Sequence, residues 1–295
     1  MESLKRGFEF LKQSWQMALA DRDLIKPSIY ALLAGFLVSL LTIVPMGVIS
    51  FFLGNIQVGR VIIYILGALL VFVQFIVTYI FSGMTVYLVY GYLAEGDGRM
   101  DKAWAIVKRD FWDIASLAAA STAVKVLRDM LKGKRGRSGL GEALGNVLGV
   151  LWTEATYLVL PIMVIEDLNL VDGMKRAAQI VRDNLLLIGI STVGVRAITG
   201  FISFLLSLVG ILLGVGVGWG VAALFAGTAW AIVAAVVLAI LIATPFILIG
   251  ALINSYTATA YHTCLYLWAR DVERAQQSGQ PASVAAPAPL AAVLK

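Results

Sequence analysis

Two charged residues lie inside otherwise apolar stretches, where they could form an ion pair or part of a proton pathway. Glu154 interrupts the apolar residues 143–165, and Arg196 is the last charge before 73 uncharged residues. Each lies about eleven residues into its own apolar segment, so two antiparallel membrane helices would bring them to a similar depth. Because an isolated charge there is costly, we predict that they are partners. A structural ion pair is favoured over a proton or ion pathway, since no chain of further acids accompanies it.

Other residues that could do chemistry are few. His262 is the only histidine, with Tyr261 and Cys264 as its near neighbours. A metal site needs several ligands, so we interpret His262 as an interfacial histidine and expect neither metal nor cofactor. The sequence contains no Gly-x-Ser-x-Gly, His-Glu-x-x-His or Walker motif. The glycines of residues 214–220 imitate part of a dinucleotide motif without its strand and helix context. We therefore expect a protein that is not an enzyme.

Small residues recur at four-residue spacing in two apolar segments, which gives a helix a smooth face for close packing. The first run contains Gly141, Gly145, Gly149 and Thr153, and the second contains Gly210, Gly214, Gly218, Ala222 and Ala226. These faces pack either against neighbouring helices of the same chain, the interpretation we favour, or against a partner protein or a second copy.

The distribution of charge indicates which solvent surrounds these elements. Of 295 residues, 60% are hydrophobic and 14% charged, compared with roughly 45–50% and 25% in soluble chains. No charge lies between Lys26 and Arg60, between Arg60 and Glu95, or between Arg196 and Arg270. Each gap exceeds the roughly 20 residues that cross a bilayer as a helix. The sequence predicts an all-α fold, a polytopic helical membrane bundle.

The chain divides into three parts. Residues 1–26 carry apolar side chains at helical spacing and predict an amphipathic N-terminal helix. This helix either lies in the membrane interface or packs, solvated, on the rest of the protein, and the pattern favours neither. Residues 27–268 form the transmembrane domain, and residues 269–295 are a Pro/Ala-rich tail that we predict to be disordered.

The number of spans depends on the middle of the transmembrane domain. Two spans precede residue 95, and two more lie in residues 185–268, with the reversal expected in the Gly-rich stretch 214–227. Two segments are ambiguous: residues 111–127, which contain Asp113 and Lys125, and residues 143–165. If both cross the membrane the chain has six spans, and if both are re-entrant it has four. If only one of them spans, the C-terminus moves outside. We favour about six.

The orientation follows from the basic residues near the first span. Five of them precede it and Arg60 alone follows it, which places the N-terminus in the cytoplasm. Six spans would put the basic connection between residues 127 and 143 outside, against this bias. Because basic residues flank the apolar runs, the net charge of +5 indicates contact with anionic lipid headgroups rather than nucleic acid.

One stretch, residues 148–184, resembles an uncharacterised prokaryotic family of six-span membrane proteins. The resemblance rests on Trp152, Ala155, Thr156, Pro161, Glu166, Lys175, Arg176 and Ala177, and on the opening SWQMALADRDLIKPSIYALL. More distantly, the arrangement is similar to the membrane domain of some glycerophosphodiesterases, without their catalytic domain. The resemblance implies six spans in a prokaryotic inner membrane and no particular activity. Glu154 departs from the apolar residue that the family pattern has there.

Three functions remain in competition. The first is a non-enzymatic subunit that assembles with membrane lipids, a protein partner or a second copy, through its Gly-rich helix faces. The second is a small transporter or channel that uses Glu154 and Arg196 as an intramembrane polar site. A membrane enzyme ranks last, because no catalytic motif is present.

Overall fold

The chain folds entirely into helices over the residues described by a computed structural model, which are 2–54, 56–133, 139–183, 185–225, 228–279 and 284–294. The α-helices are α1 (Glu2–Ala20), α2 (Lys26–Leu53), α3 (Gln57–Glu95), α4 (Met100–Arg109), α5 (Phe111–Gly133), α6 (Gly139–Glu166), α7 (Leu170–Asp183), α8 (Leu185–Leu224), α9 (Ala229–Gln277) and α10 (Ala288–Leu294). A short 3₁₀ helix, Arg22–Leu24, precedes α2. These elements agree with the all-α prediction.

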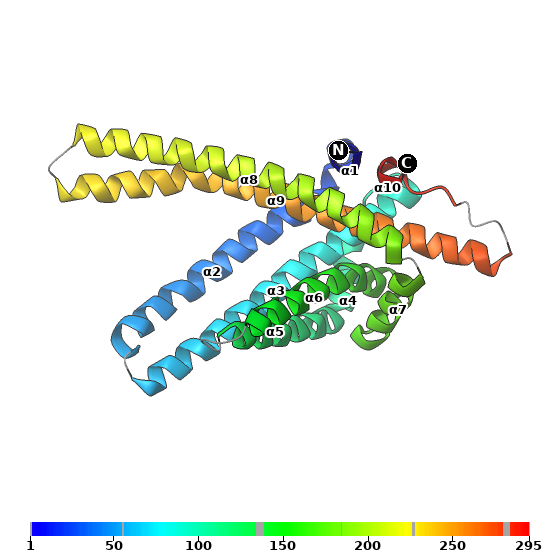
Figure 1. Cartoon of the computed structure of the whole chain (residues 1–295), viewed down its shortest axis with the longest axis horizontal. Coiled ribbons are helices and arrows are strands. Elements are labelled where there is room, and N and C mark those ends of the chain that lie inside the picture. The colour runs from blue at the N-terminus through cyan, green and yellow to red at the C-terminus, as the bar shows by residue number, and fades with distance from the viewer. Residues whose placement is uncertain are drawn as a thin grey trace.

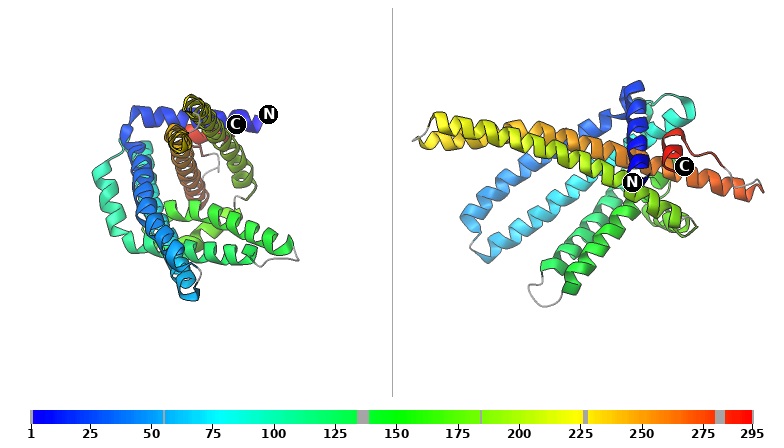
Figure 2. Two further views of the ribbon diagram at one scale, coloured as in Figure 1. Left: turned by 90° about the vertical axis from the view of Figure 1, so that its left-hand side faces the viewer. Right: turned by 45° about the horizontal axis from the view of Figure 1, so that its top comes forward.

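Six of the helices form three antiparallel hairpins, α2–α3, α5–α6 and α8–α9, which we call the arms. The arms spread from a common region and end in separate tips (Figure 1). The short helices α1, α4, α7 and α10 gather at the other end, together with both termini, and we call this region the base (Figure 2). Because the chain returns to the base after every arm, the two termini lie at the same end of the molecule.

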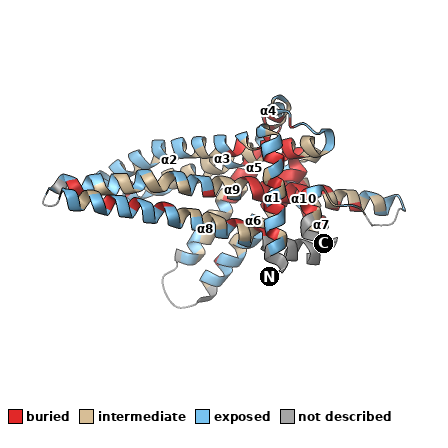
Figure 3. Ribbon diagram, turned by 90° about the horizontal axis from the view of Figure 1, so that it is seen from above, coloured by how far each residue is buried: buried red, intermediate tan, exposed pale blue. Residues whose placement is uncertain are grey.

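Burial follows the same division. Buried residues concentrate where the arms meet the base, whereas the outer parts of the arms are mostly exposed or intermediate (Figure 3). The core includes Phe10, Leu88 and Ile162, each 0% exposed, while Phe51 and Trp219 on the arms are 83% and 78% exposed. Apolar surface of this extent needs an apolar solvent. The arms are therefore suited to a bilayer.

Five helical segments are long and apolar enough to cross a membrane among the described residues: 22–53, 57–95, 141–166, 195–224 and 230–277. The sixth predicted segment is the helix α5, which has 23 residues. It is less apolar than the others because it carries Asp113, Lys125, Arg128 and Asp129. The reversal between α8 and α9 lies after Leu224, at the end of the Gly-rich stretch where it was expected.

The two terminal segments both pack on the rest of the chain. On α1, the Phe10 ring meets the Tyr261 ring edge-on with centroids 5.2 Å apart, and Trp15 Nε1 donates to Thr257 Oγ1 at 3.2 Å. In the tail, predicted to be disordered over residues 269–295, the described residues 269–279 and 284–294 include two helical segments, and residues 280–283 and 295 lie outside the described residues. The helix α9 continues to Gln277, and α10 follows with Leu290 fully buried. The aliphatic residues of the tail supply an apolar face that α1 covers.

The small residues of both runs bring helices of this chain together. A Cβ added to Gly218 would lie 2.7 Å from the carbonyl oxygen of Ala235 on α9, and Gly210 and Gly214 are equally close to α9. In α6, Gly141 and Gly145 face backbone carbonyls of α5. These five glycines therefore pack against helices of the same chain, and Ala226 lies outside the described residues.

Candidate functional site

Glu154 and Arg196 meet between α6 and α8. Glu154 lies 12 residues before α6 ends at Glu166, and Arg196 lies 11 residues after α8 begins at Leu185. The helix α6 runs towards the base and α8 runs away from it. Because the two residues lie nearly the same number of residues from the base ends of their helices, their side chains are at a similar depth. The carboxylate and the guanidinium form an ion pair, with 36% and 34% of their side-chain surfaces exposed.

His262 of α9 joins this pair, although the sequence predicted an isolated interfacial histidine. Its side chain is 2% exposed, and Nε2 lies 3.8 Å from Glu154 Oε2. Nδ1 lies 2.7 Å from the carbonyl oxygen of Ala258, and since a carbonyl only accepts, Nδ1 donates the proton of that bond. Nε2 faces the Glu154 carboxylate and has no hydrogen-bond partner among the described residues, so the three side chains form one polar cluster.

Counting residues along the predicted spans would not have found His262, because α9 continues to Gln277, past residue 268 where the transmembrane domain was expected to end. The sequence alone does not show which helix faces which, so α9 was not connected with α6. Among the described residues, no group of three or more possible metal ligands occurs here or elsewhere.

Tyr157 connects the charged cluster with a cavity. Its ring stacks on the His262 ring with centroids 4.5 Å apart, and the Arg196 guanidinium lies over it at 5.1 Å. Tyr157 also lines a cavity of about 430 Å³ whose walls come from α3, α5, α6 and α9. Each of the three arms thus contributes to this cavity, which lies where they converge.

Hydrogen bonds across the cavity wall hold three helices in place. Ser121 of α5 lies at the centre: its Oγ is 2.7 Å from the hydroxyl of Tyr79 on α3 and accepts from Trp152 Nε1 on α6 at 2.9 Å. Tyr79 and Ser121 are almost fully buried. Trp152, Thr156 and Pro161, on which the family resemblance partly rests, all line the cavity.

Two basic residues of α5 lie at one end of the cavity. Lys125 Nζ contacts Asp129 at 2.9 Å, and Arg128 Nε is 3.6 Å from the same carboxylate. Arg128 Nε is buried and has no hydrogen-bond partner among the described residues. Its chain lies on Gly149, where an added Cβ would come within 2.9 Å of Arg128 Cδ and Nη1. The bare glycine face of α6 therefore leaves room for this arginine.

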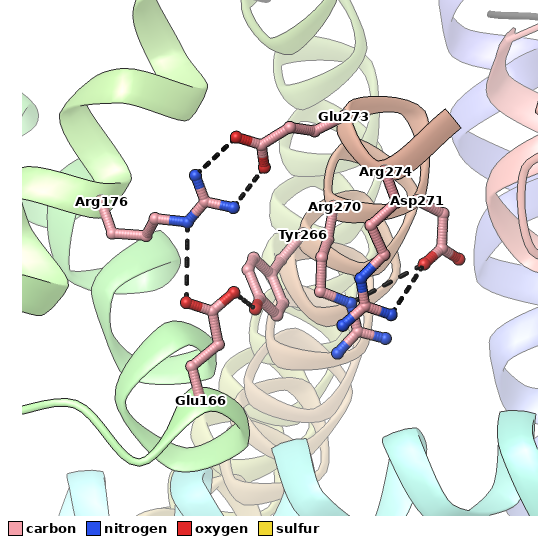
Figure 4. Close-up of polar contacts among 7 residues, drawn as sticks. All are labelled: Glu166, Arg176, Tyr266, Arg270, Asp271, Glu273 and Arg274. Atoms are coloured by element: carbon pink, nitrogen blue, oxygen red, sulfur yellow. Dashed lines mark hydrogen bonds and ion pairs between the residues drawn. The ribbon is translucent and has the colours of Figure 1, made fainter. Parts of the chain in front are cut away.

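A second polar network fastens α6, α7 and α9 together at the base (Figure 4). Arg176 binds both carboxylate oxygens of Glu273 and lies 3.6 Å from Glu166, which accepts a hydrogen bond from the Tyr266 hydroxyl at 2.5 Å. The hydrogen bonds with Glu273 raise the pKa of Arg176 above its ordinary value. Glu166 and Arg176, also residues of the resemblance, thus have a structural role.

Comparison with known proteins adds a family and no activity. A family described as "Family of unknown function (DUF6159)" matches residues 61–276, which include the cavity, the charged cluster and the network at the base. No curated protein and no solved structure matches the chain. The comparisons give no support to the distant likeness to the membrane domain of glycerophosphodiesterases.

Proposed function

The chain belongs to the DUF6159 family of unknown function, and on this premise we propose that it is a non-enzymatic binding subunit of the membrane. Its partner is an amphipathic molecule from the bilayer, held in the cavity where the three arms converge. The observation that carries this proposal is the cavity itself, whose largely apolar wall carries several polar and two basic side chains, between otherwise apolar arms. The five long apolar helices support a membrane protein, and the family match leaves its activity open.

The chemistry of the cavity favours a ligand with a polar part. Ser82, Asn254 and Ser255 line it, and so does Thr78, whose hydroxyl already donates to the carbonyl oxygen of Gln74 at 2.8 Å. Polar groups in an apolar surrounding are costly unless a hydrogen-bonding partner satisfies them. A volume of about 430 Å³ is typical of small-molecule sites. The apolar faces of the arms begin beside the cavity. A molecule with a polar part for the cavity and an apolar part for these faces therefore fits.

The reactive groups support binding rather than catalysis. Glu154 is paired with Arg196, and the thiol of Cys264 is fully buried. In the network at the base, Glu166, Arg176 and Glu273 bind one another and connect helices. These groups would have to break structural contacts before they could act on a substrate.

We also propose that the protein lies in a prokaryotic inner membrane with the base and the N-terminus in the cytoplasm. The helices of the base carry many of the basic residues, including Lys5, Lys108 and Lys175. The tip of the α2–α3 arm has Arg60 alone, and residues 197–269 of the α8–α9 arm carry no charge. This asymmetry supports a cytoplasmic base. The bias is opposed by Lys125 and Arg128 of α5 and by the basic residues that follow them in the sequence, which are Lys132, Lys134, Arg135 and Arg137.

Native mass spectrometry of the full chain, extracted in mild detergent, tests the binding proposal. We expect the wild type to retain a small lipid-like ligand, and Ser255→Phe, which fills the cavity from α9, to lose it. Val236→Phe adds the same ring to an exposed position of the same helix and should keep the ligand. Ser82→Phe fills the cavity from α3 and replaces the first variant if that does not fold. Retention unchanged in the cavity-filling variants would refute the proposal.

A second candidate, a small transporter, is favoured by the cluster of Glu154, Arg196 and His262. Arg196 Nη2 and His262 Nε2 are buried and lack hydrogen-bond partners among the described residues, so the cluster can bind a further polar group or proton. Measurement of proton or ion flux into proteoliposomes that contain the purified protein separates the two candidate functions. If the combined change Glu154→Gln and Arg196→Met abolishes flux while folding stays normal, the protein is a transporter. Without flux in the wild type, the binding proposal stands.

A further inference from the structure

The cavity has a pronounced charge asymmetry. Lys125 and Arg128 line it, and none of the described residues that line it is acidic. Asp129, which follows Arg128 on α5, contacts both cations and neutralises only one of the two positive charges. A net positive charge remains at this end of the cavity. The charge favours an anionic ligand and disfavours a cationic one.

Both basic groups retain the capacity to bind an anion. The side chains of Lys125 and Arg128 are each 37% exposed. Arg128 Nε is buried without a hydrogen-bond partner among the described residues, so one donor of the guanidinium is unsatisfied beside the cavity. Guanidinium and ammonium groups bind phosphate oxygens through charge-assisted hydrogen bonds. The position of Arg128 is set by the close approach of Gly149.

The rest of the wall fits the other parts of a phospholipid. Thr78, Ser82 and Asn254 offer donors and acceptors for glycerol and ester oxygens. Phe75, Val124 and Leu160 add apolar contacts. Outside the cavity, the tip half of α6 exposes Leu144, Val147 and Leu151, which are 61%, 55% and 63% exposed. Acyl chains can follow this surface, whereas a free phosphate ion would use none of it.

We propose that the cavity binds the headgroup of an anionic phospholipid, with Lys125 and Arg128 on its phosphate and its acyl chains between the arms. This proposal rests on the proposed binding function and names the ligand class of the same site. It also gives a role to Lys125 and Arg128, two of the basic residues that oppose the positive-inside bias, because a lipid phosphate neutralises the positive charge that Asp129 leaves.

The test offers the purified full chain an equal mixture of phosphatidylglycerol and phosphatidylcholine in micelles and counts bound lipids by native mass spectrometry. We expect the wild type to prefer phosphatidylglycerol by about tenfold or more, because both lipids carry the same phosphate and the positive charge of the cavity repels only the choline cation of phosphatidylcholine. The combined change Lys125→Gln and Arg128→Gln should reduce this preference at least severalfold. Arg60→Gln removes an exposed cation from the tip of the α2–α3 arm and should leave the preference unchanged.

The outcomes separate this proposal from the proposed function. If the wild type retains both lipids equally, the anionic specificity is refuted and the binding function stands. Retention of neither lipid refutes both. Displacement of phosphatidylglycerol by millimolar inorganic phosphate would identify a free anion as the ligand and refute the lipid. If the double variant does not fold, the combined change Lys125→Arg and Arg128→Lys keeps both charges and must keep the preference, while Gly149→Leu, which displaces the guanidinium, must lower it.

Discussion

The pair of Glu154 and Arg196 gives a quantitative prediction about stability. Glu154→Gln keeps the shape of the side chain and removes its charge, so Arg196 loses its ionic partner between α6 and α8. Insertion scales assign roughly 2.5–3.5 kcal/mol to an unpaired charge at the centre of a membrane helix. Because about a third of each side chain is exposed, its surroundings can compensate partly. We expect Glu154→Gln and Arg196→Met each to lower the free energy of unfolding by about 2 kcal/mol.

The combined variant distinguishes a pair from two independent residues. With both charges removed no unpaired ion remains, so Glu154→Gln with Arg196→Met should lie within about 1 kcal/mol of the wild type. The two single effects add to about 4 kcal/mol, and the coupling energy is therefore about 3 kcal/mol.

Unfolding by sodium dodecyl sulfate in mixed micelles, followed by circular dichroism, measures these differences. Lys26→Gln breaks the exposed ion pair with Asp23 at the base and serves as the control, with an expected change below about 0.5 kcal/mol. Strictly additive single effects would show that the residues do not stabilise each other. A Glu154→Gln variant as stable as the wild type would refute the argument that this depth is costly for an unpaired charge.

Three further results are expected. Gly218→Ala should destabilise the protein by about 1–3 kcal/mol, because its Cβ would meet a carbonyl oxygen of α9 at 2.7 Å, whereas Gly216→Ala, which has no atom within 4 Å, should be nearly neutral in the same unfolding assay. Tyr266→Phe removes the hydroxyl that donates to a carboxylate of α6 and should cost about 1 kcal/mol, and no loss would contradict a structural role for the network at the base. For topology, Ser278→Cys should react with a thiol reagent only from the cytoplasm and Thr228→Cys only from outside, while the buried native Cys264 gives no background. Labelling of both from one side would overturn the proposed orientation.

The sequence contained enough information for the elements of the fold. Runs without charge have only one stable secondary structure in hydrocarbon, since every backbone polar group must be satisfied within the helix. The long helices between Lys26 and Gln277 and the turn after Leu224 follow from this constraint. The partnership of Glu154 and Arg196 was also predictable, because depth in a membrane is a count of residues along a helix.

Other parts of the fold were not accessible from residue counts. The tail was predicted to be disordered from its Pro/Ala-rich composition, yet Leu290 is buried against the base. The face of α1 that carries Phe10 was equally suited to lipid or to protein, and the structure packs it on α9. In both cases the sequence specifies an apolar surface, and only the position of its neighbours decides what covers it.

The candidate site depends most strongly on tertiary structure. Residue counts give the depth of a side chain but not the direction it faces around the helix bundle. The contact of His262 with Glu154 therefore depends on how the arms pack against one another. The same holds for Ser121, which lies between Tyr79 and Trp152. The cavity has the same origin, because three arms that diverge from one base leave a space at their junction that belongs to no single segment of the sequence.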